Sequence, residues 1–243
     1  MICFLSIFLV PSTAEAWGPL THVYLGNEVL NLGTTLIPAG IYSLIKKFKS
    51  DFIYGNLSAD IIIGKRFQEL KKNTHNWDIA WKLLGAAKTN QQKAFAYGYL
   101  THLSADTVVH NLEKTRLPFK HTFMEVKSDS IIDKKYRKIL KGLARKNVHH
   151  RNDVFLEDML ECVFFSFKMN KRIFRGILFL SRVQNYSPLS NFIDKRFPYE
   201  IPVMDIYKSQ EESLKRMIEL LRNGENSKVL MEHPLGKYRR KAS

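Results

Sequence analysis

The sequence has little cysteine and lacks a long apolar run. Only Cys3 and Cys162 occur among its 243 residues, which excludes the small secreted domains that disulfides hold together. No apolar stretch approaches the ~20 residues that a membrane-spanning helix needs. The 12 Gly and 8 Pro are too few for a collagenous or disordered chain. A chain of this length can bury a core of its own, so the sequence predicts a globular protein.

Acidic residues are scarce relative to basic ones. The chain has 38 Lys and Arg against 23 Asp and Glu, a formal net charge of +15. This imbalance favours a phosphate-bearing partner such as nucleic acid or anionic lipid. The most basic segment spans residues 134–146. It is either a solvated helix face or an electrostatic platform for anionic lipid or nucleic acid.

The first residues have the pattern of a signal peptide. Residues 2–10 are largely apolar, Pro11 follows, and Ala14-Glu15-Ala16 is an A-x-A cleavage signature. We therefore expect residues 1–16 to be removed and Trp17 to become the new N-terminus of an exported protein, periplasmic or extracellular. One feature of a signal peptide is missing, since no Lys or Arg precedes the apolar core. The alternative is an apolar N-terminal helix.

The rest of the chain has the apolar spacing of helices. Alternating patterns typical of strands are nearly absent, which predicts an all-α fold. Asn90 and Asp153 are expected to be N-caps, and Gly33 and Gly224 to terminate helices. The expected helices are 23–32, 41–48, 77–84, 94–112, 131–143, 154–167, 173–183 and 206–221.

Polar residues interrupt the apolar helix expected at 94–112. His102, Asp106 and His110 are four residues apart, so they face broadly one way. Burying two imidazoles and a carboxylate is costly unless something compensates, and a metal ion is the usual compensation. A second pair, His121 and Glu125, repeats the spacing.

Further imidazole and carboxylate groups lie upstream. Asp60 ends an apolar stretch, His75 lies in a polar loop, and His22 follows Trp17 by five residues. A single histidine on a helix is usually a core or surface residue, but imidazoles and carboxylates together without thiolate are the donors expected of catalytic zinc. The histidines in basic or tail contexts are expected to be solvated, and these are His149, His150 and His233.

These residues stand in ordered motifs, namely Trp17-Gly18-x-x-Thr21-His22, Gly55-x-x-x-x-Asp60, Thr74-His75, His102-Leu103-x-x-Asp106-x-x-x-His110 and His121-x-x-x-Glu125. In them the chain resembles the zinc-dependent phospholipase C family, which is related in fold to the S1/P1 single-strand nucleases and to the N-terminal domain of glycosylphosphatidylinositol phospholipase D. The resemblance implies a single-domain multi-helix bundle of the phospholipase C/P1 nuclease type over residues 17–205, clearest over 17–129, with the metal site in the helical core. Residues 206–243 would form a C-terminal helix and a basic tail.

The resemblance also implies up to three zinc ions per chain, Zn²⁺ being the cofactor. One ion would be bound by the α-amino group and carbonyl oxygen of Trp17, by His22 and by Asp106. Asp106 would bridge to a second ion, which Asp60, His75 and His102 also bind. The third would take His110, His121 and Glu125. In the phospholipase C and nuclease prototypes the second histidine follows the bridging aspartate by six residues rather than four, so His110 is alternatively a core residue or a support for the ligands.

The predicted function is that of an exported zinc-dependent phosphodiesterase, a hydrolase that cleaves phospholipid head groups in the manner of phospholipase C. Two zinc ions that share a carboxylate, about 3.5–4 Å apart, activate water as hydroxide for attack on a phosphodiester. Asp106 and Asp60 are the predicted catalytic residues, Asp106 as the bridge and Asp60 as a group that orients or deprotonates the nucleophile.

The alternatives are an S1/P1-type single-strand nuclease, phospholipase D-like cleavage and a non-catalytic zinc-binding relative. The expected partner is a phospholipid or membrane surface as substrate, with nucleic acid as the alternative substrate, no transmembrane span, and a monomeric chain. Aromatic side chains that are candidates to line either a base pocket or an acyl groove are Tyr54, Phe67, Trp77, Trp81 and Phe119.

Overall fold

The structure is a computed structural model that describes residues 17–62, 74–109, 120–143, 146–160, 166–183 and 202–235. Within these ranges the regular elements are helices, and strands are absent. The predicted all-α fold is therefore confirmed. The expected signal peptide, residues 1–16, lies outside the described residues.

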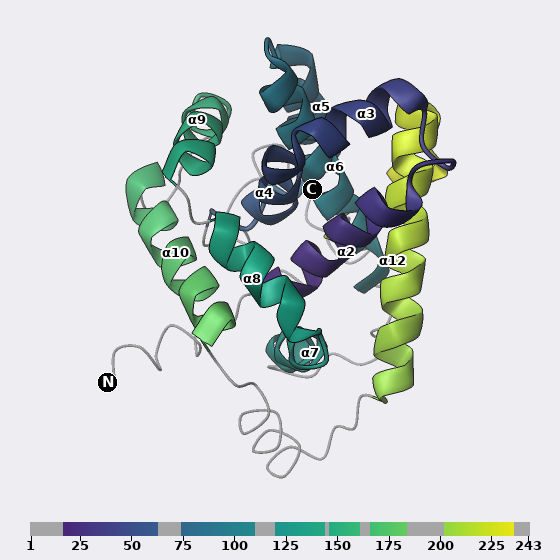
Figure 1. Ribbon diagram of the computed structural model, residues 1–243, viewed down its shortest axis with the longest axis vertical. Helices are drawn as coiled ribbons and strands as arrows, with labels where there is room; N and C mark the ends of the chain where they lie inside the picture. The colour runs from purple at the N-terminus through teal and green to yellow at the C-terminus, as the bar shows by residue number, and fades with distance from the viewer. Residues whose placement is uncertain are drawn as a thin grey trace, which may run out of the picture.

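The helices form a bundle around one central helix, α6 (Figure 1). Helices α4, α5 and α12 pack against α6, and α2 packs against α4, α8 and α12. Helices α9 and α10 lie together on one side of the bundle (Figure 1). The helix bounds are α2 Pro19–Leu32, α3 Ala39–Lys47, α4 Lys49–Ser58, α5 Trp77–Ala86, α6 Asn90–Val109, α7 Lys120–Ser130, α8 Lys134–Leu143, α9 Lys146–Glu157, α10 Phe167–Val183 and α12 Val203–Asn223.

Helix α6 is buried along most of its length. From Ala94 to Val109, Tyr97 is the one residue that is not buried. A helix with no polar face belongs in the interior, where other helices cover it on all sides. Its N-terminus carries a capping box in which Thr89 Oγ1 accepts from Gln92 N and Gln92 Oε1 accepts from Thr89 N. The cap is thus Thr89, and the expectation that Asn90 is the N-cap is off by one residue.

Two glycines let α4 and α6 approach backbone to backbone. A Cβ on Gly55 would lie 2.1 Å from the carbonyl oxygen of Phe95, and one on Gly98 would lie 2.0 Å from that of Phe52. No side chain other than hydrogen fits at either position. This close crossing sets the position of the C-terminal end of α4, just beyond which Asp60 lies, relative to α6.

A buried polar cluster attaches α9 and α10 to α4. Tyr54 donates a hydrogen bond of 2.5 Å to Asp153, and the ammonium of Lys171 lies 2.9 Å from the same carboxylate oxygen. Asp153 lies inside α9, so its expected role as an N-cap is wrong. The ring of His149 packs on Tyr54 at 4.2 Å. Burial lowers the pKa of His149 to about 4, so this histidine is a neutral packing residue, contrary to the solvated role expected for it.

Helix bounds differ from expectation where apolar spacing is a poor guide. The helix expected at 154–167 is wrong, because α9 ends at Glu157. There the hydrogen bond Met159 N to Leu156 O tightens the chain into a turn. Helices α4 and α7 were not expected, since α4 is buried on every side and α7 is mostly polar. The terminators Gly33 and Gly224 are confirmed, Gly224 with a positive φ of 56°.

Across the described residues, no helix combines the length and the apolar character that crossing a membrane requires. The C-terminal helix α12 packs against α6 and α2 in the bundle.

We expect Gly55→Ala to lower the free energy of unfolding by about 3 kcal/mol, because the added methyl group meets a backbone carbonyl that cannot move aside. The matched control is Gly85→Ala, also near a helix end, where an added Cβ meets nothing within 4 Å. Alanine should raise helix stability there by up to about 1 kcal/mol. Urea unfolding of the two variants measures both effects, and equal stabilities would refute the backbone contact.

Candidate metal centre

The centre of the bundle holds an uncommon concentration of buried polar groups. Helix α6 places His102 and Asp106 one turn apart on one face, and α2 supplies His22. His75 comes from the segment that precedes α5, and all four side chains are 0% exposed. The structure thus brings together six of the residues singled out in the sequence: Trp17, His22, Asp60, His75, His102 and Asp106.

The carboxylate of Asp106 is the hub of this cluster. Its Oδ2 lies 3.1 Å from Nε2 of His75 and 3.1 Å from Nε2 of His102. Its Oδ1 lies 3.3 Å from Nε2 of His22 and 3.3 Å from the backbone nitrogen of Trp17. The two oxygens of one carboxylate therefore face two different sets of nitrogen atoms.

Asp60 gives the cluster its contact with solvent. Its Oδ1 lies 3.5 Å from Nε2 of His75 and 3.9 Å from Nε2 of His102. Its side chain is 23% exposed, whereas the imidazoles beside it are fully buried. Two groups of side chains have donor atoms that all lie within 4.8 Å of one another, namely His22, His102 and Asp106, and Asp60, His75 and His102.

A backbone carbonyl fixes the tautomer of His102. Nδ1 of this ring lies 2.8 Å from the carbonyl oxygen of Asn56 on α4. A carbonyl oxygen only accepts hydrogen bonds, so Nδ1 carries the proton and Nε2 presents a lone pair toward Asp106. A carbonyl behind an imidazole in this way is the usual support of a metal-ligating histidine.

His22 is buried without the hydrogen bonds that a buried imidazole normally makes. Its ring stacks on that of His102 with centroids 4.0 Å apart. Neither ring nitrogen has a hydrogen-bond partner within the described part of the chain, although Nε2 faces Asp106. A buried polar group in this state costs free energy unless another group satisfies it.

Electrostatics favour the protonation states that a metal requires. Burial, with the nearby His102 as a second cause, lowers the pKa of His22 and keeps the ring neutral. Burial alone would raise the pKa of Asp106, but the charge and hydrogen bonds of the His102 and His22 rings hold it well below its usual range, so a proton that enters the cluster resides on an imidazole and Asp106 is ionised. Neutral imidazoles and an ionised carboxylate are the forms that bind metal.

The donor set fits zinc. Packing three imidazoles and a carboxylate at zero exposure is costly when no cation binds the converging lone pairs. Imidazole nitrogens and carboxylate oxygens without thiolate are ligands of catalytic zinc sites. The unpartnered nitrogens of His22 and the fixed tautomer of His102 are two independent features that a bound cation would explain.

Residues with no metal-binding role position the start of α2. The carboxylate of Asp129 on α7 accepts hydrogen bonds from Leu20 N at 3.0 Å and Thr21 N at 2.8 Å, so it caps a helix from a distance. A Cβ on Gly18 would lie 2.5 Å from this carboxylate. Asp129 therefore sets where Trp17 and His22 lie relative to Asp106.

Two further side chains complete this support. The indole nitrogen of Trp17 donates to Ser213 Oγ on α12 at 2.9 Å, and Ser213 in turn donates to the carbonyl of Ala105 on α6. Tyr99 donates to the carbonyl of Thr74 at 2.7 Å and holds the segment that carries His75. Sequence reasoning missed Asp129, Ser213, Tyr99 and Asn56. Only Asn56, next to Gly55 in a recognised motif, carried a signal that could have identified it.

Only part of the third expected ligand set lies within the described residues. His110 lies outside the described residues, as does the side chain of His121, whose backbone belongs to α7. Glu125 is half-buried on the same helix. The assignment of these three residues to a metal stays a prediction.

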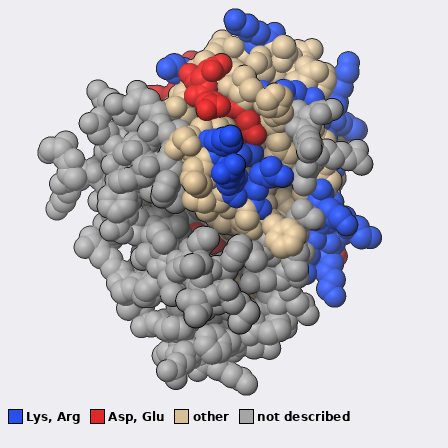
Figure 2. Space-filling view, turned by 90° about the vertical axis from the view of Figure 1, so that its left-hand side faces the viewer, with Lys and Arg blue, Asp and Glu red and all other residues tan. Residues whose placement is uncertain are grey.

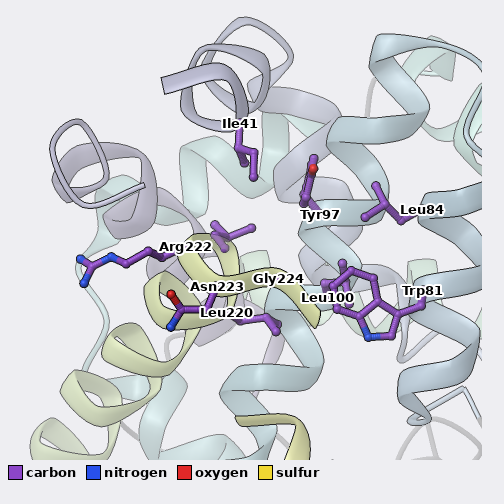
Figure 3. A pocket seen from close by; sticks show the side chains of 10 residues that line it. Ile41, Trp81, Leu84, Tyr97, Leu100, Leu220, Arg222, Asn223 and Gly224 are labelled. Carbon is purple, nitrogen blue, oxygen red and sulfur yellow. The ribbon is translucent and has the colours of Figure 1, made fainter. Parts of the chain in front are cut away.

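Of the aromatic residues expected near the site, those that the structure describes lie elsewhere. Tyr54 bonds to Asp153, and the Trp77 indole donates to the carbonyl of Glu232. Trp81 lines a separate, mostly apolar pocket of about 220 Å³ between α3, α5, α6 and α12 (Figure 3). Tyr97 and Leu100, which line it, lie on a different face of α6 from the metal cluster. Phe67 and Phe119 are outside the described residues.

Comparison with known proteins gives one family match. The family described as zinc dependent phospholipase C matches residues 21–199. A curated uncharacterized protein of Archaeoglobus fulgidus is 33% identical over 118 residues, which cover 44% of this chain. The matched stretch covers 31% of that protein, so the chain spans less than a third of its relative's length. No solved structure gives a match.

The buried carboxyl of Asp129 makes stability depend on pH. Burial raises its pKa from 3.8 to about 6, so the folded state favours the protonated form more than the unfolded state does. This contribution is complete below the unfolded pKa and is lost as the pH rises through the folded pKa. In chelator-treated protein, the stability of the wild type relative to Asp129→Asn should fall by up to about 3 kcal/mol between about pH 4 and about pH 6.

Urea unfolding across this pH range measures the effect, with the exposed Asp158→Asn as the control that should track the wild type. A wild-type to Asp129→Asn difference that stays constant with pH would contradict the prediction.

Proposed function

The chain belongs to the zinc-dependent phospholipase C family, and from this we propose that it is an exported zinc-dependent phosphodiesterase that hydrolyses phospholipid head groups as a phospholipase C does. The observation that carries the proposal is the buried Asp106 carboxylate, whose two oxygens face two separate sets of nitrogen donors. This is the arrangement that a carboxylate bridging two metal ions needs.

The proposed ligands divide along the same carboxylate. On the side of Oδ1 they are Trp17 and His22, and on the side of Oδ2 they are His75, His102 and Asp60. A third zinc would be held by His110, His121 and Glu125. When bound, zinc supplies positive charge that stabilises the phosphodiester oxygens and makes a water molecule acidic enough to attack at neutral pH.

The protein's own groups have distinct roles in this proposal. Asp60 is the partly exposed carboxylate at the edge of the cluster, and it accepts a hydrogen bond from the attacking water, which it orients toward phosphorus. Asp106 stays ionised and buried, and keeps the imidazoles in place. Asn56 holds the proton of His102 on Nδ1. Hydrolysis of the phospholipase C type then breaks the bond between phosphorus and the glycerol oxygen.

Export is part of the proposal because of Trp17. Its backbone nitrogen lies 3.3 Å from Oδ1 of Asp106. A peptide nitrogen is a poor metal ligand, whereas a free α-amino group is a good one. Removal of residues 1–16 would therefore complete the donor set on the Oδ1 side.

Within the described part of the chain, the aromatic side chains favour a lipid substrate over a nucleic acid. Base stacking next to the metals is what a nuclease of single strands would need. Tyr54, Trp77 and Trp81 are engaged elsewhere in the bundle. The nuclease, phospholipase D-like and non-catalytic alternatives are outcomes that the experiments below distinguish.

Zinc titration of the mature protein tests the ligand set. We expect two or three zinc ions per chain. Removing a group that supports a ligand lowers metal affinity about 10- to 100-fold, and removing the ligand itself should cost at least as much. His75→Ala should therefore lower zinc affinity by at least that factor. The matched control His150→Ala removes an exposed imidazole from α9 and should bind zinc as the wild type does. Elemental analysis and calorimetry provide the readout, and a mature wild type that binds no zinc would refute the ligand set.

The same titration distinguishes the role of the terminal amine. A chain that retains one residue ahead of Trp17 should bind zinc more weakly at the Oδ1 side. Unchanged affinity in that chain would exclude the α-amino ligand while leaving the histidine ligands in place.

The reaction is tested by activity of wild type and Asp106→Asn on three substrates: phosphatidylcholine vesicles, glycosylphosphatidylinositol and single-stranded DNA. The wild type should release diacylglycerol from phosphatidylcholine. Asp106→Asn should lose at least about 10²–10³-fold in kcat/KM, as expected for removing a group central to transition-state electrostatics.

The control Asp78→Asn changes an exposed carboxylate on α5 and should keep full activity. Circular dichroism should show the same helical spectrum for all three proteins. Release of phosphatidic acid would instead identify D-type cleavage, hydrolysis of DNA alone would identify the nuclease, and no hydrolysis by zinc-loaded wild type would support a non-catalytic relative.

A further inference from the structure

Helix α8 is basic on its exposed side and apolar on its buried side. Its sequence contains five Lys or Arg and no Asp or Glu. Lys134, Lys138 and Lys141 are exposed and follow one another at helical spacing, so they form one row. The buried residues Tyr136, Leu140 and Leu143 lie on the opposite side.

Helix α10 repeats this arrangement. It too contains five Lys or Arg and no acidic residue. Lys168, Arg172 and Arg175 are exposed and lie in one row, and the next position of that row is Phe179. Phe174 and Leu178 are buried on the other side of the helix.

The two rows belong to neighbouring helices. Helices α8 and α10 pack against each other, so their solvent faces adjoin (Figure 1). Figure 2 shows the side of the molecule on which α10 lies, with Lys and Arg gathered at the centre of the view and along its right-hand edge. We call the exposed residues of both rows the basic face.

Apolar side chains are exposed in the basic face and beside it. Phe179 is 54% exposed and Met169 is 41% exposed on α10. Cations alone would suit any polyanion, but an apolar side chain exposed among them can enter the interface of an anionic bilayer, where apolar burial adds to the attraction between cations and head groups. A base could stack on Phe179 but not on the thioether side chain of Met169, so the two exposed side chains together favour a lipid bilayer over a nucleic acid.

We propose that the basic face of α8 and α10 docks this protein on an anionic phospholipid bilayer, with the cations at the head groups and Phe179 inserted at the level of the first methylenes. This proposal rests on the proposed function, because the proposed phospholipid substrate lies in a membrane. Docking itself needs no turnover, and so it is measured separately from hydrolysis.

Docking would act on the concentration of substrate rather than on the chemical step. Anionic lipid attracts cations near its surface over about a Debye length, and salt screens this attraction. Each Lys or Arg near such a surface strengthens binding roughly fivefold. The basic face holds the protein at a surface dense in phosphodiesters without contributing a ligand to the metal centre.

Co-sedimentation with vesicles tests the proposal on the full mature protein. We expect binding to vesicles of phosphatidylcholine with phosphatidylserine, weaker binding to phosphatidylcholine alone, and a decline as salt is raised. The variant Lys134→Gln/Lys138→Gln/Lys168→Gln/Arg172→Gln should bind the anionic vesicles up to about 600-fold more weakly, a factor of roughly five for each cation removed. Its matched control, Lys82→Gln/Lys93→Gln/Lys208→Gln/Lys228→Gln, removes four exposed lysines from outside the face and should bind much as the wild type does.

Phe179→Ala tests the apolar contact. It should weaken vesicle binding roughly tenfold and leave a larger share of the remaining binding sensitive to salt. Its control, Leu32→Ala, removes a side chain of similar exposure from α2 and should have no effect. Thermal unfolding of each variant shows whether it keeps the fold, and the variants of the exposed Lys and Arg residues should match the wild type.

Hydrolysis of a water-soluble, short-chain phosphodiester separates this proposal from the proposed function. The four-cation variant of the basic face should retain wild-type activity on that soluble substrate and lose activity on vesicles. Vesicle binding by a wild type that hydrolyses nothing would support the docking face and refute the enzyme. Equal loss of vesicle binding in the four-cation variant and in its four-lysine control would overturn the docking face. So would a four-cation variant that loses binding to single-stranded DNA while its vesicle binding is unchanged.

Discussion

A fully buried carboxylate surrounded by imidazoles is the constraint on which this fold depends. Asp106 and His22, His75 and His102 have no exposed surface, and their converging lone pairs call for a cation. Helix α6, the central helix, carries two of these groups. The bundle is therefore built around polar groups that are stabilised only together. Any displacement of α2 or α4 relative to α6 would separate the atoms that face Asp106.

The positions of these helices come from close backbone contacts and from distant polar contacts. Gly55 and Gly98 allow α4 and α6 to touch, and this contact brings the Asn56 carbonyl within hydrogen-bond distance of His102. Asp129 caps α2 from another helix. Ser213, 196 residues from Trp17 in sequence, holds its indole. The metal centre thus depends on residues that would themselves bind no metal.

The surface helices α8 and α10 also have two sides with different roles. Helices α8 and α10 use one side to pack into the bundle and the other to present cations. Their basic rows account for much of the charge imbalance that the sequence shows. Under the proposals made above, the interior performs the hydrolysis and the basic face brings a bilayer to it. The two parts can be altered independently because exposed lysines make no contact with the buried cluster.

The sequence by itself determined the helical class, the candidate ligands and the family, because helical periodicity and motif spacing are local properties of the chain. It failed for α4, which is buried on all sides, and for α7, which is mostly polar, since neither has an amphipathic period. Only the tertiary structure decided that Oδ1 and Oδ2 of Asp106 face different donors, and that Asp129 and Ser213 support them. These contacts join residues about 90 to 200 positions apart, and no local pattern encodes which distant residue meets which when the helices pack.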